Sequence, residues 1–282
     1  MVNSAIKQER LQNIFNKKSG NAVIIPLDYG LYMGSVKGIE DPVKIVNKLI
    51  DNKVDGTIMS FGLGKVTANL FYTKKYISKI LSVDYMLTST MPGMEEGIFG
   101  NTLLSSVEQA IKWGFDAIKA FLIWGVEPNL QLQNIKYIGK LARSCDKHDM
   151  PLIIEPLLIG KNIPENKRND PKLIMDTCRI AMEMGADILK ISYPGDKESF
   201  SQIVKNSYIP VVILGGPKKE GKIKEMLRMT KSAIEVGGKG IVFGRNVWQS
   251  SKMDNIISAL KDIVHNNNGV DEVLEKYNLC NL

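Results

Sequence analysis

Short apolar runs alternate with longer amphipathic stretches along most of this chain. Helical periodicity is clearest over Pro42–Asn52, Ser106–Trp113, Leu130–His148, Pro171–Met184 and Lys222–Val236. Runs of apolar residues with strand-like length lie between these stretches, and alternation of this kind predicts parallel βαβ units. We expect strands at Ala22–Asp28, Val54–Ser60, Tyr85–Ser89, Ala117–Trp124, Leu152–Leu157, Ile188–Tyr193, Val211–Gly215 and Ile241–Gly244.

Eight such units in 282 residues predict an α/β fold, a TIM (β/α)8 barrel that forms a single domain over residues 1–282. An amphipathic N-terminal helix and a C-terminal pair, Met253–His265 and Val270–Tyr277, would be additions to the barrel. The glycine-rich stretch Thr90–Asn101 is expected to be a loop. The alternative is an open doubly wound sheet, but Gly62 and Gly64 after the second strand lack the third glycine of a dinucleotide-binding loop.

Composition narrows the class of protein. With 44% hydrophobic residues the chain can bury a sizeable core, and a net charge of +7 without interleaved aromatic residues gives little support to nucleic-acid binding. No secretory signal is visible, and the longest apolar run, Pro151–Gly160, is too short to span a membrane. We expect a soluble, cytoplasmic protein. Three scattered cysteines and two isolated histidines predict reduced thiols and no metal site; they are Cys145, Cys178, Cys280, His148 and His265.

Four of the predicted strands carry a charged residue where apolar residues dominate. Lys190 lies in the sixth strand, Glu155 in the fifth, Lys119 near the start of the fourth, and Asp28 closes the first. A desolvated lysine is an amine nucleophile toward carbonyls, so Lys190 indicates Schiff-base chemistry. Lys119 would lower the pKa of Lys190, and apolar surroundings would raise the pKa of Glu155, which suits a proton shuttle. The structural alternatives are outward-facing lysines, buried ion pairs, and a loop-capping role for Asp28.

The last two strands end in glycine. Gly215 and Gly216 follow the seventh strand, and Gly244 and Arg245 follow the eighth. Glycines there let backbone N–H groups approach an anion, and barrel enzymes commonly bind phosphate at these two loops. Arg245 could bind two phosphate oxygens, so a phosphorylated substrate is predicted, with plain tight turns as the alternative.

These motifs resemble a known superfamily. Leu27-Asp28-Tyr29-Gly30, Gly185–Lys190, Gly215–Lys218 and Gly244–Gln249 are similar to the archaeal-type class I fructose-bisphosphate aldolases, a superfamily that also holds aminodideoxyheptulosonate synthases and LsrF-type thiolases. The resemblance covers roughly Val23 to Tyr277. It implies that Lys190 forms the Schiff base, that Asp28 assists, that the glycines and Arg245 hold phosphate, and that the barrels self-associate.

Two departures from that pattern bear on the substrate. Tyr29 stands where many relatives have histidine, and the fifth strand offers Glu155 and Leu157 where archaeal fructose-bisphosphate aldolases place an aromatic acid-base residue. The surroundings of Lys119 and Glu155 are instead similar to tagatose-bisphosphate and sulfofructose-phosphate aldolases, in which the glutamate shuttles protons.

The sequence therefore predicts a class I aldolase of carbohydrate metabolism that needs no metal or other cofactor, because its intermediate is a covalent imine on lysine. The expected substrate is a ketose bisphosphate, cleaved to dihydroxyacetone phosphate and an aldehyde. One alternative keeps the imine but transfers a carbon unit or acetyl group, as in the synthase and thiolase relatives. Another is a non-catalytic sugar-phosphate sensor. Tyr193 and Tyr29 are further candidates for proton transfer, although strand alternation places Tyr193 on the face opposite Lys190.

Overall fold

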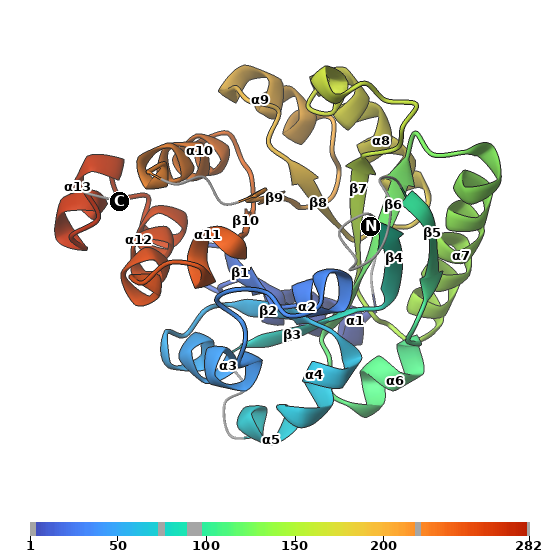
Figure 1. Cartoon of the computed structure of the whole chain (residues 1–282), viewed down its shortest axis with the longest axis horizontal. Helices are drawn as coiled ribbons and strands as arrows, with labels where there is room; N and C mark the ends of the chain where they lie inside the picture. Colours follow the sequence, from blue (N-terminus) through green and yellow to red (C-terminus); the bar gives the residue numbers. More distant parts are fainter. Residues whose placement is uncertain (1–3, 73–76, 89–97, 218–220, 281–282) are drawn as a thin grey trace.

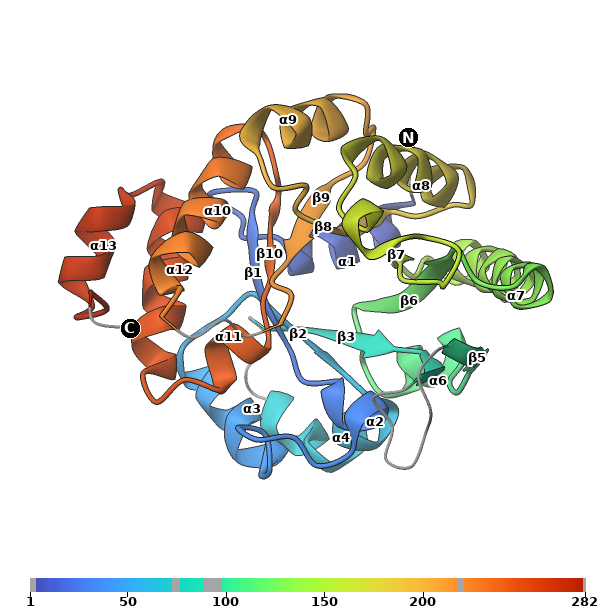
Figure 2. The ribbon, with the colours of Figure 1, turned by 45° about the horizontal axis from the view of Figure 1, so that its top comes forward.

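The computed structural model describes residues 4–72, 77–88, 98–217 and 221–280. Its strands close into a parallel barrel of eight, in the order β1-β10-β9-β8-β7-β6-β3-β2 (Figures 1 and 2). The predicted TIM barrel is confirmed. The barrel strands are β1 (Ala22–Pro26), β2 (Gly56–Met59), β3 (Ser78–Ser82), β6 (Ala117–Trp124), β7 (Leu152–Leu158), β8 (Ile188–Ser192), β9 (Val211–Leu214) and β10 (Gly240–Val242).

Helices surround this barrel (Figure 1). The long helices predicted from periodicity are present, two of them beginning at Pro128 and Pro171, as the fixed φ of proline favours. Those that the structure describes are α1 (Ala5–Ile14), α2 (Tyr29–Met33), α3 (Pro42–Asp51), α4 (Phe61–Val66), α5 (Ala68–Phe71), α6 (Val107–Lys112), α7 (Pro128–Lys147), α8 (Pro171–Glu183), α9 (Lys197–Lys205), α10 (Ile223–Glu235), α11 (Arg245–Trp248), α12 (Met253–Asn266) and α13 (Val270–Lys276), with a 3-10 turn at Glu165–Lys167. Among them, none is long and apolar enough to cross a membrane.

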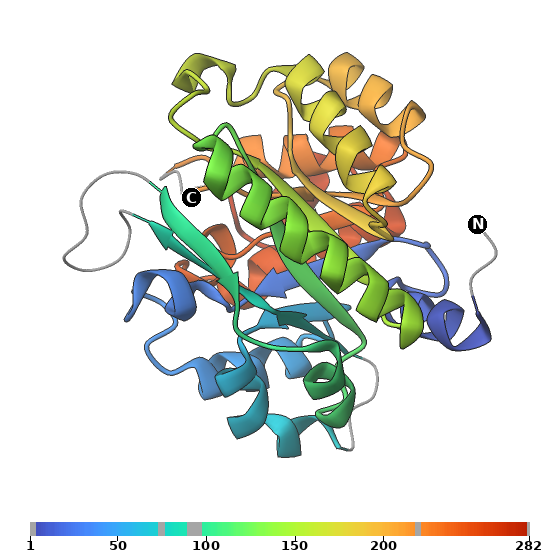
Figure 3. The ribbon, with the colours of Figure 1, turned by 90° about the vertical axis from the view of Figure 1, so that its right-hand side faces the viewer.

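The third predicted strand was wrong. The barrel strand is β3, whereas the predicted Tyr85–Ser89 largely coincides with β4 (Asp84–Thr88), which pairs antiparallel with β5 (Ile98–Leu103) outside the barrel. Serine and lysine break the apolar pattern of β3, although its five residues are all buried. The expected loop Thr90–Asn101 is partly strand β5, and its residues 90–97 lie outside the described ranges. Figure 3 shows this hairpin beside α7.

Side chains fill the barrel in layers. An apolar plug at the N-terminal end takes two residues from β1 and one from each other strand, and it closes against Ile14 of α1; its strand members are Ala22, Ile24, Ile58, Ile80, Ala117, Ile153, Ile188, Val212 and Val242. Successive strand residues face opposite sides of a sheet, so positions two residues further along point into the barrel again. On β3, β6, β7 and β8 those positions are Ser82, Lys119, Glu155 and Lys190. We call these four residues the polar layer.

Candidate active site

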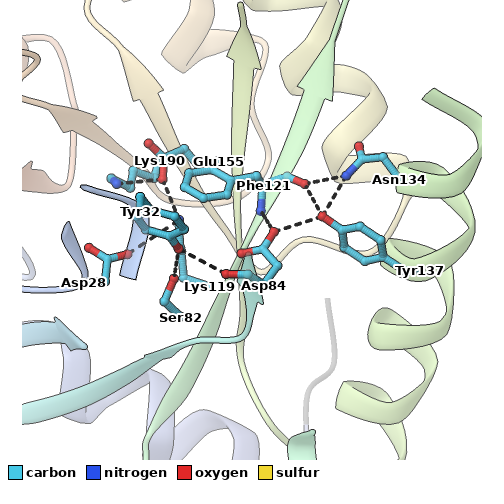
Figure 4. Close-up of polar contacts among 10 residues, drawn as sticks. All are labelled: Asp28, Tyr32, Ser82, Asp84, Lys119, Phe121, Asn134, Tyr137, Glu155 and Lys190. Carbon is cyan, nitrogen blue, oxygen red and sulfur yellow. Dashed lines mark hydrogen bonds and ion pairs between the residues drawn. The ribbon is translucent and has the colours of Figure 1, made fainter. Parts of the chain in front are cut away.

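Lys190, Glu155 and Lys119 form a buried line of charges in the polar layer (Figure 4). Glu155 Oε2 lies 2.7 Å from Lys190 Nζ and 3.3 Å from Lys119 Nζ. Lys190 and Glu155 are 7% and 5% exposed, and Lys119 is fully buried. An outward-facing lysine is therefore wrong as an interpretation of either lysine, and each is held in the barrel by a shared carboxylate.

Asp28 completes the group from the C-terminal end of β1. Its Oδ2 lies 3.8 Å from Lys119 Nζ, and the residue is buried. Although Asp28 precedes α2 at the N-cap position, its side chain makes no capping hydrogen bond. The loop-capping alternative is thus not supported, because the carboxylate is turned toward Lys119. The four charges that lie far apart in sequence meet at the barrel mouth, as the sequence predicted.

The expected raised pKa of Glu155 was wrong. Burial alone would raise it, but the two ammonium groups of Lys190 and Lys119, each within hydrogen-bonding reach, together lower the pKa below its usual value. Glu155 is consequently an ionised carboxylate at neutral pH. It is suited to begin a reaction as a base, with Lys190 as its hydrogen-bond donor at 2.7 Å.

Sequence reasoning missed Tyr32, Ser82 and Asp84, which line the same end of the barrel. The Tyr32 hydroxyl lies 2.6 Å from Ser82 Oγ and donates to the Asp84 backbone oxygen at 3.2 Å. Its ring lies 5.6 Å from Lys119 Nζ, within the range of a cation–π contact. Burial raises the pKa of Tyr32 well above its usual range, and Asp28 and Asp84 add to this effect. The hydroxyl is therefore protonated.

Asp84 is a fully buried carboxylate at the base of the β4–β5 hairpin. Its Oδ2 accepts hydrogen bonds from the Phe121 backbone N–H at 2.7 Å and from the Tyr137 hydroxyl at 2.9 Å. Asn134 of α7 bonds both Tyr137 and the Phe121 carbonyl oxygen, so the network fixes the β6 segment that follows Lys119 (Figure 4). Burial raises the pKa of Asp84 to about 6, against the opposing effect of Lys119. Its position on a misassigned strand hid this residue from the sequence pattern.

The predicted phosphate residues gather at the ends of β9 and β10. Gly216 has φ +63°, a conformation that favours glycine, and a Cβ on Gly215 would lie 2.8 Å from Phe243. Gly244 directly precedes Arg245 at the start of α11. Within the described part of the chain, the buried Nε of Arg245 has no hydrogen-bond partner. Arg245 thus offers a cationic donor without a partner, and Gly216 has open space where a Cβ would lie, whereas Gly215 is required by its packing on Phe243.

The two candidate tyrosines lie in different places. Tyr29 lies beside Arg245, whose guanidinium carbon is 5.2 Å from the ring centroid. Burial raises the pKa of Tyr29, and Asp28 and Glu155 act in the same direction while Arg245 opposes them, so Tyr29 stands between the phosphate residues and the carboxylates. Tyr193 instead packs on Phe200, with ring centroids 5.4 Å apart, on the outer face that strand alternation predicted.

The cysteines and histidines play no part in this site. Cys145 and Cys178 are buried free thiols, and Cys280 is an exposed one. His148 pairs with Glu108 and His265 with Asp55, away from the polar layer. Across the described residues no three His, Cys, Asp or Glu side chains cluster as metal ligands would.

Known proteins match both the sequence and the fold. A model of the DeoC/LacD family of aldolases matches residues 22–250. An uncharacterized aldolase of Saccharolobus solfataricus is 33% identical, over 98% of this chain and 99% of the relative. The 2-amino-3,7-dideoxy-D-threo-hept-6-ulosonate synthase 1 of Archaeoglobus fulgidus is 31% identical over 95% of each chain.

Solved structures of aldolases also match the fold of this chain. An archaeal fructose 1,6-bisphosphate aldolase superposes with a TM-score of 0.79 at 26% identity, over 92% of this chain and 99% of its own. Another structure of such an aldolase, 25% identical, has its catalytic lysine covalently bound to the carbinolamine intermediate of the substrate. The resemblance seen in the sequence is confirmed, and the chain belongs to the DeoC/LacD family of aldolases.

Proposed function

We propose that this protein is a class I aldolase that cleaves or forms a phosphorylated ketose through an imine on Lys190. The observation that carries the proposal is the 2.7 Å hydrogen bond between Lys190 Nζ and an ionised Glu155 inside the barrel. It gives the amine a base that can take its proton and a water-excluded place to react. The solved relative with a carbinolamine on its lysine supports the same chemistry.

The proposed steps use the buried pair of Lys190 and Glu155. Glu155 takes a proton from Lys190, and the neutral amine attacks the ketone carbon to give a carbinolamine. Loss of water, with protons supplied by Glu155, leaves an iminium ion. Glu155, ionised again, removes the proton of the hydroxyl on the far carbon of the bond to be broken, the carbon β to the iminium. That carbon–carbon bond then breaks, its electron pair enters the iminium to form an enamine, and the aldehyde leaves.

The return steps regenerate the lysine. The enamine carbon takes up a proton, and water hydrolyses the iminium to release dihydroxyacetone phosphate and the free amine. Lys119, paired with Asp28 and Glu155, keeps both carboxylates oriented toward the reacting atoms. Gly215, Gly216, Gly244 and Arg245 would hold the phosphate. The partnerless Nε of Arg245 and the open space beside Gly216 support this assignment.

Borohydride trapping tests the imine. The protein is incubated with dihydroxyacetone phosphate and sodium borohydride, and the modified peptide is identified by mass spectrometry. We expect the reduced adduct on Lys190. The matched control is Lys79→Met, because Lys79 is another buried strand lysine but points outward and donates to the Trp113 carbonyl oxygen. The adduct should persist in that variant and be absent from Lys190→Met. An adduct elsewhere, or none, refutes the mechanism, as does loss of activity with a chelator.

A second candidate is a synthase that uses the same enamine to join two carbon chains. The heptulosonate synthase similarity at 31% identity favours it. The two candidate functions share the imine on Lys190. They differ in the direction of the reaction, cleavage or condensation, and in the aldehyde that takes part. Measuring cleavage and condensation with the same ketose phosphates distinguishes them.

A further inference from the structure

We infer that the substrate carries phosphate at one end only, so that the aldehyde half of the ketose is an uncharged polyol aldehyde. This inference rests on the proposed aldol reaction at Lys190. It replaces the bisphosphate expected from the family resemblance. The aldehyde half would lie at the end of the site lined by Tyr32, Ser82 and Asp84, which we call the hydroxyl subsite (Figure 4).

The two ends of the site lie on different strands of the barrel. Arg245 and the glycines follow β9 and β10, whereas Ser82 ends β3, on the other side of the barrel order from β9. Lys190 and Glu155, on β8 and β7, lie between these ends. A ketose bound by its phosphate at Arg245 and by its carbonyl at Lys190 therefore directs its remaining carbons toward the hydroxyl subsite.

Charge at the hydroxyl subsite disfavours a second phosphate. Lys119 is the cation there, and it already pairs with Glu155 at 3.3 Å and Asp28 at 3.8 Å. Asp84 adds a third carboxyl group close enough to interact electrostatically with Lys119. A phosphate would bring up to two further negative charges to a place with three carboxyl groups, where the two ammonium groups, Lys119 and Lys190, are already paired with carboxylates. Like charges in a buried site repel strongly because water screens them poorly.

The same surroundings favour sugar hydroxyls. Tyr32 and Ser82 present hydroxyl groups that both donate and accept hydrogen bonds, and they lie 2.6 Å apart. The carboxylate oxygens of Asp28 and Glu155 accept from a substrate hydroxyl but not from a phosphate dianion, which has no proton to donate. The hydroxyls of a polyol chain can therefore form hydrogen bonds with these hydroxyl and carboxylate groups, whereas a phosphate would be repelled by the carboxylates.

Few cations lie near the hydroxyl subsite in the described sequence. Segments 28–36, 54–64 and 81–88, which follow or contain the ends of β1, β2 and β3, hold no lysine or arginine, although Lys37 and Lys65 follow the first two. By contrast, residues 217–224 after β9 hold four lysines. Lys161, on the loop after β7, pairs with Glu127 at 2.8 Å and is 75% exposed. Lys222 and Lys224 likewise pair with Glu225 and Asp271, so among the described residues it is Arg245, with a buried Nε that has no partner, that marks the end where the single phosphate would bind.

Matched pairs of aldehydes test the inference in the condensation direction. Dihydroxyacetone phosphate is supplied as donor, with D-glyceraldehyde or its 3-phosphate, and D-erythrose or its 4-phosphate, as acceptor. We expect kcat/KM to be at least tenfold higher for the unphosphorylated member of each pair. Tyr32→Phe and Ser82→Ala should raise KM for the unphosphorylated aldehyde by roughly 5- to 50-fold, the effect of losing a hydrogen bond. Tyr208→Phe, an exposed tyrosine outside the site, is the matched control.

The outcomes separate this inference from the function on which it rests. Preference for the phosphorylated aldehydes, or no product from any of the four while borohydride still traps dihydroxyacetone phosphate on Lys190, overturns the inference and leaves the imine intact. Failure to trap any adduct overturns the proposed function itself. Equal KM values for the parent, Tyr32→Phe and Ser82→Ala would also overturn the single-phosphate inference, because the hydroxyls of Tyr32 and Ser82 would then not contact the aldehyde half.

Discussion

Asp84→Asn should remove a pH dependence from the stability of the protein. Asp84 is fully buried, and burial raises its pKa to about 6 from an ordinary value of 3.8. Between these two values the native state binds more protons than the unfolded chain. The free energy of unfolding therefore falls as pH rises through this window, and the loss is nearly complete at pH 7. An asparagine stays neutral throughout, so the variant lacks the fall.

The magnitude follows from the difference in pKa. About 2 pH units at about 1.4 kcal/mol per unit give a total of about 3 kcal/mol. Some of that loss has already occurred at pH 5, and about 1.3 kcal/mol remains between pH 5 and pH 7. The free energy of unfolding of Asp84→Asn minus that of the parent should increase by this amount over the interval. Any constant offset, such as an altered bond to Tyr137, cancels in the comparison.

Urea denaturation at pH 5, 6 and 7, at one protein concentration, measures the difference. The control is Glu165→Gln, because Glu165 is a carboxylate with a side chain that is 88% exposed. Its pH dependence should match that of the parent. If the Asp84→Asn and parent curves are parallel, Asp84 does not titrate in this range, and the reasoning from its burial is refuted.

Other predictions concern activity. Lys190→Met should lower kcat/KM by roughly 10⁴-fold or more without unfolding the protein, as circular dichroism would show; substantial remaining turnover would exclude an imine at this residue. Glu155→Gln should lower kcat by about 10²- to 10⁴-fold, the usual contribution of a general acid-base group. Lys119→Met removes an ammonium 3.3 Å from Glu155, so the acidic limb of the kcat profile should move to higher pH. Arg245→Ala should raise KM for phosphorylated substrates by about 10- to 100-fold and change kcat less, because the guanidinium would bind the phosphate in both ground and transition states.

Sequence reasoning placed the charged residues well because strand alternation is strict. Lys119, Glu155 and Lys190 each follow an apolar plug residue by two positions, and a one-residue slip of any strand would turn its charge out of the barrel. The pKa of Glu155 was out of reach for a different reason. Its direction depends on how close two ammonium groups lie to one carboxylate, and strand assignment does not fix that distance.

Two of the three residues that sequence reasoning missed lie outside the inward–outward alternation of the barrel strands. Tyr32 is on the five-residue helix α2, and Asp84 begins a hairpin that leaves the barrel, so neither follows a barrel alternation. Ser82 does follow it, but serine in a strand carries little chemical signal by itself. The polar layer that would perform the bond chemistry is thus set by the repeat of the barrel. The hydroxyl subsite that would bind the aldehyde half is formed largely by α2 and the β4–β5 hairpin, which interrupt that repeat. The barrel can therefore keep Lys190, Glu155 and Lys119 in register while the hairpin and α2 change, which makes substrate choice separable from the imine chemistry.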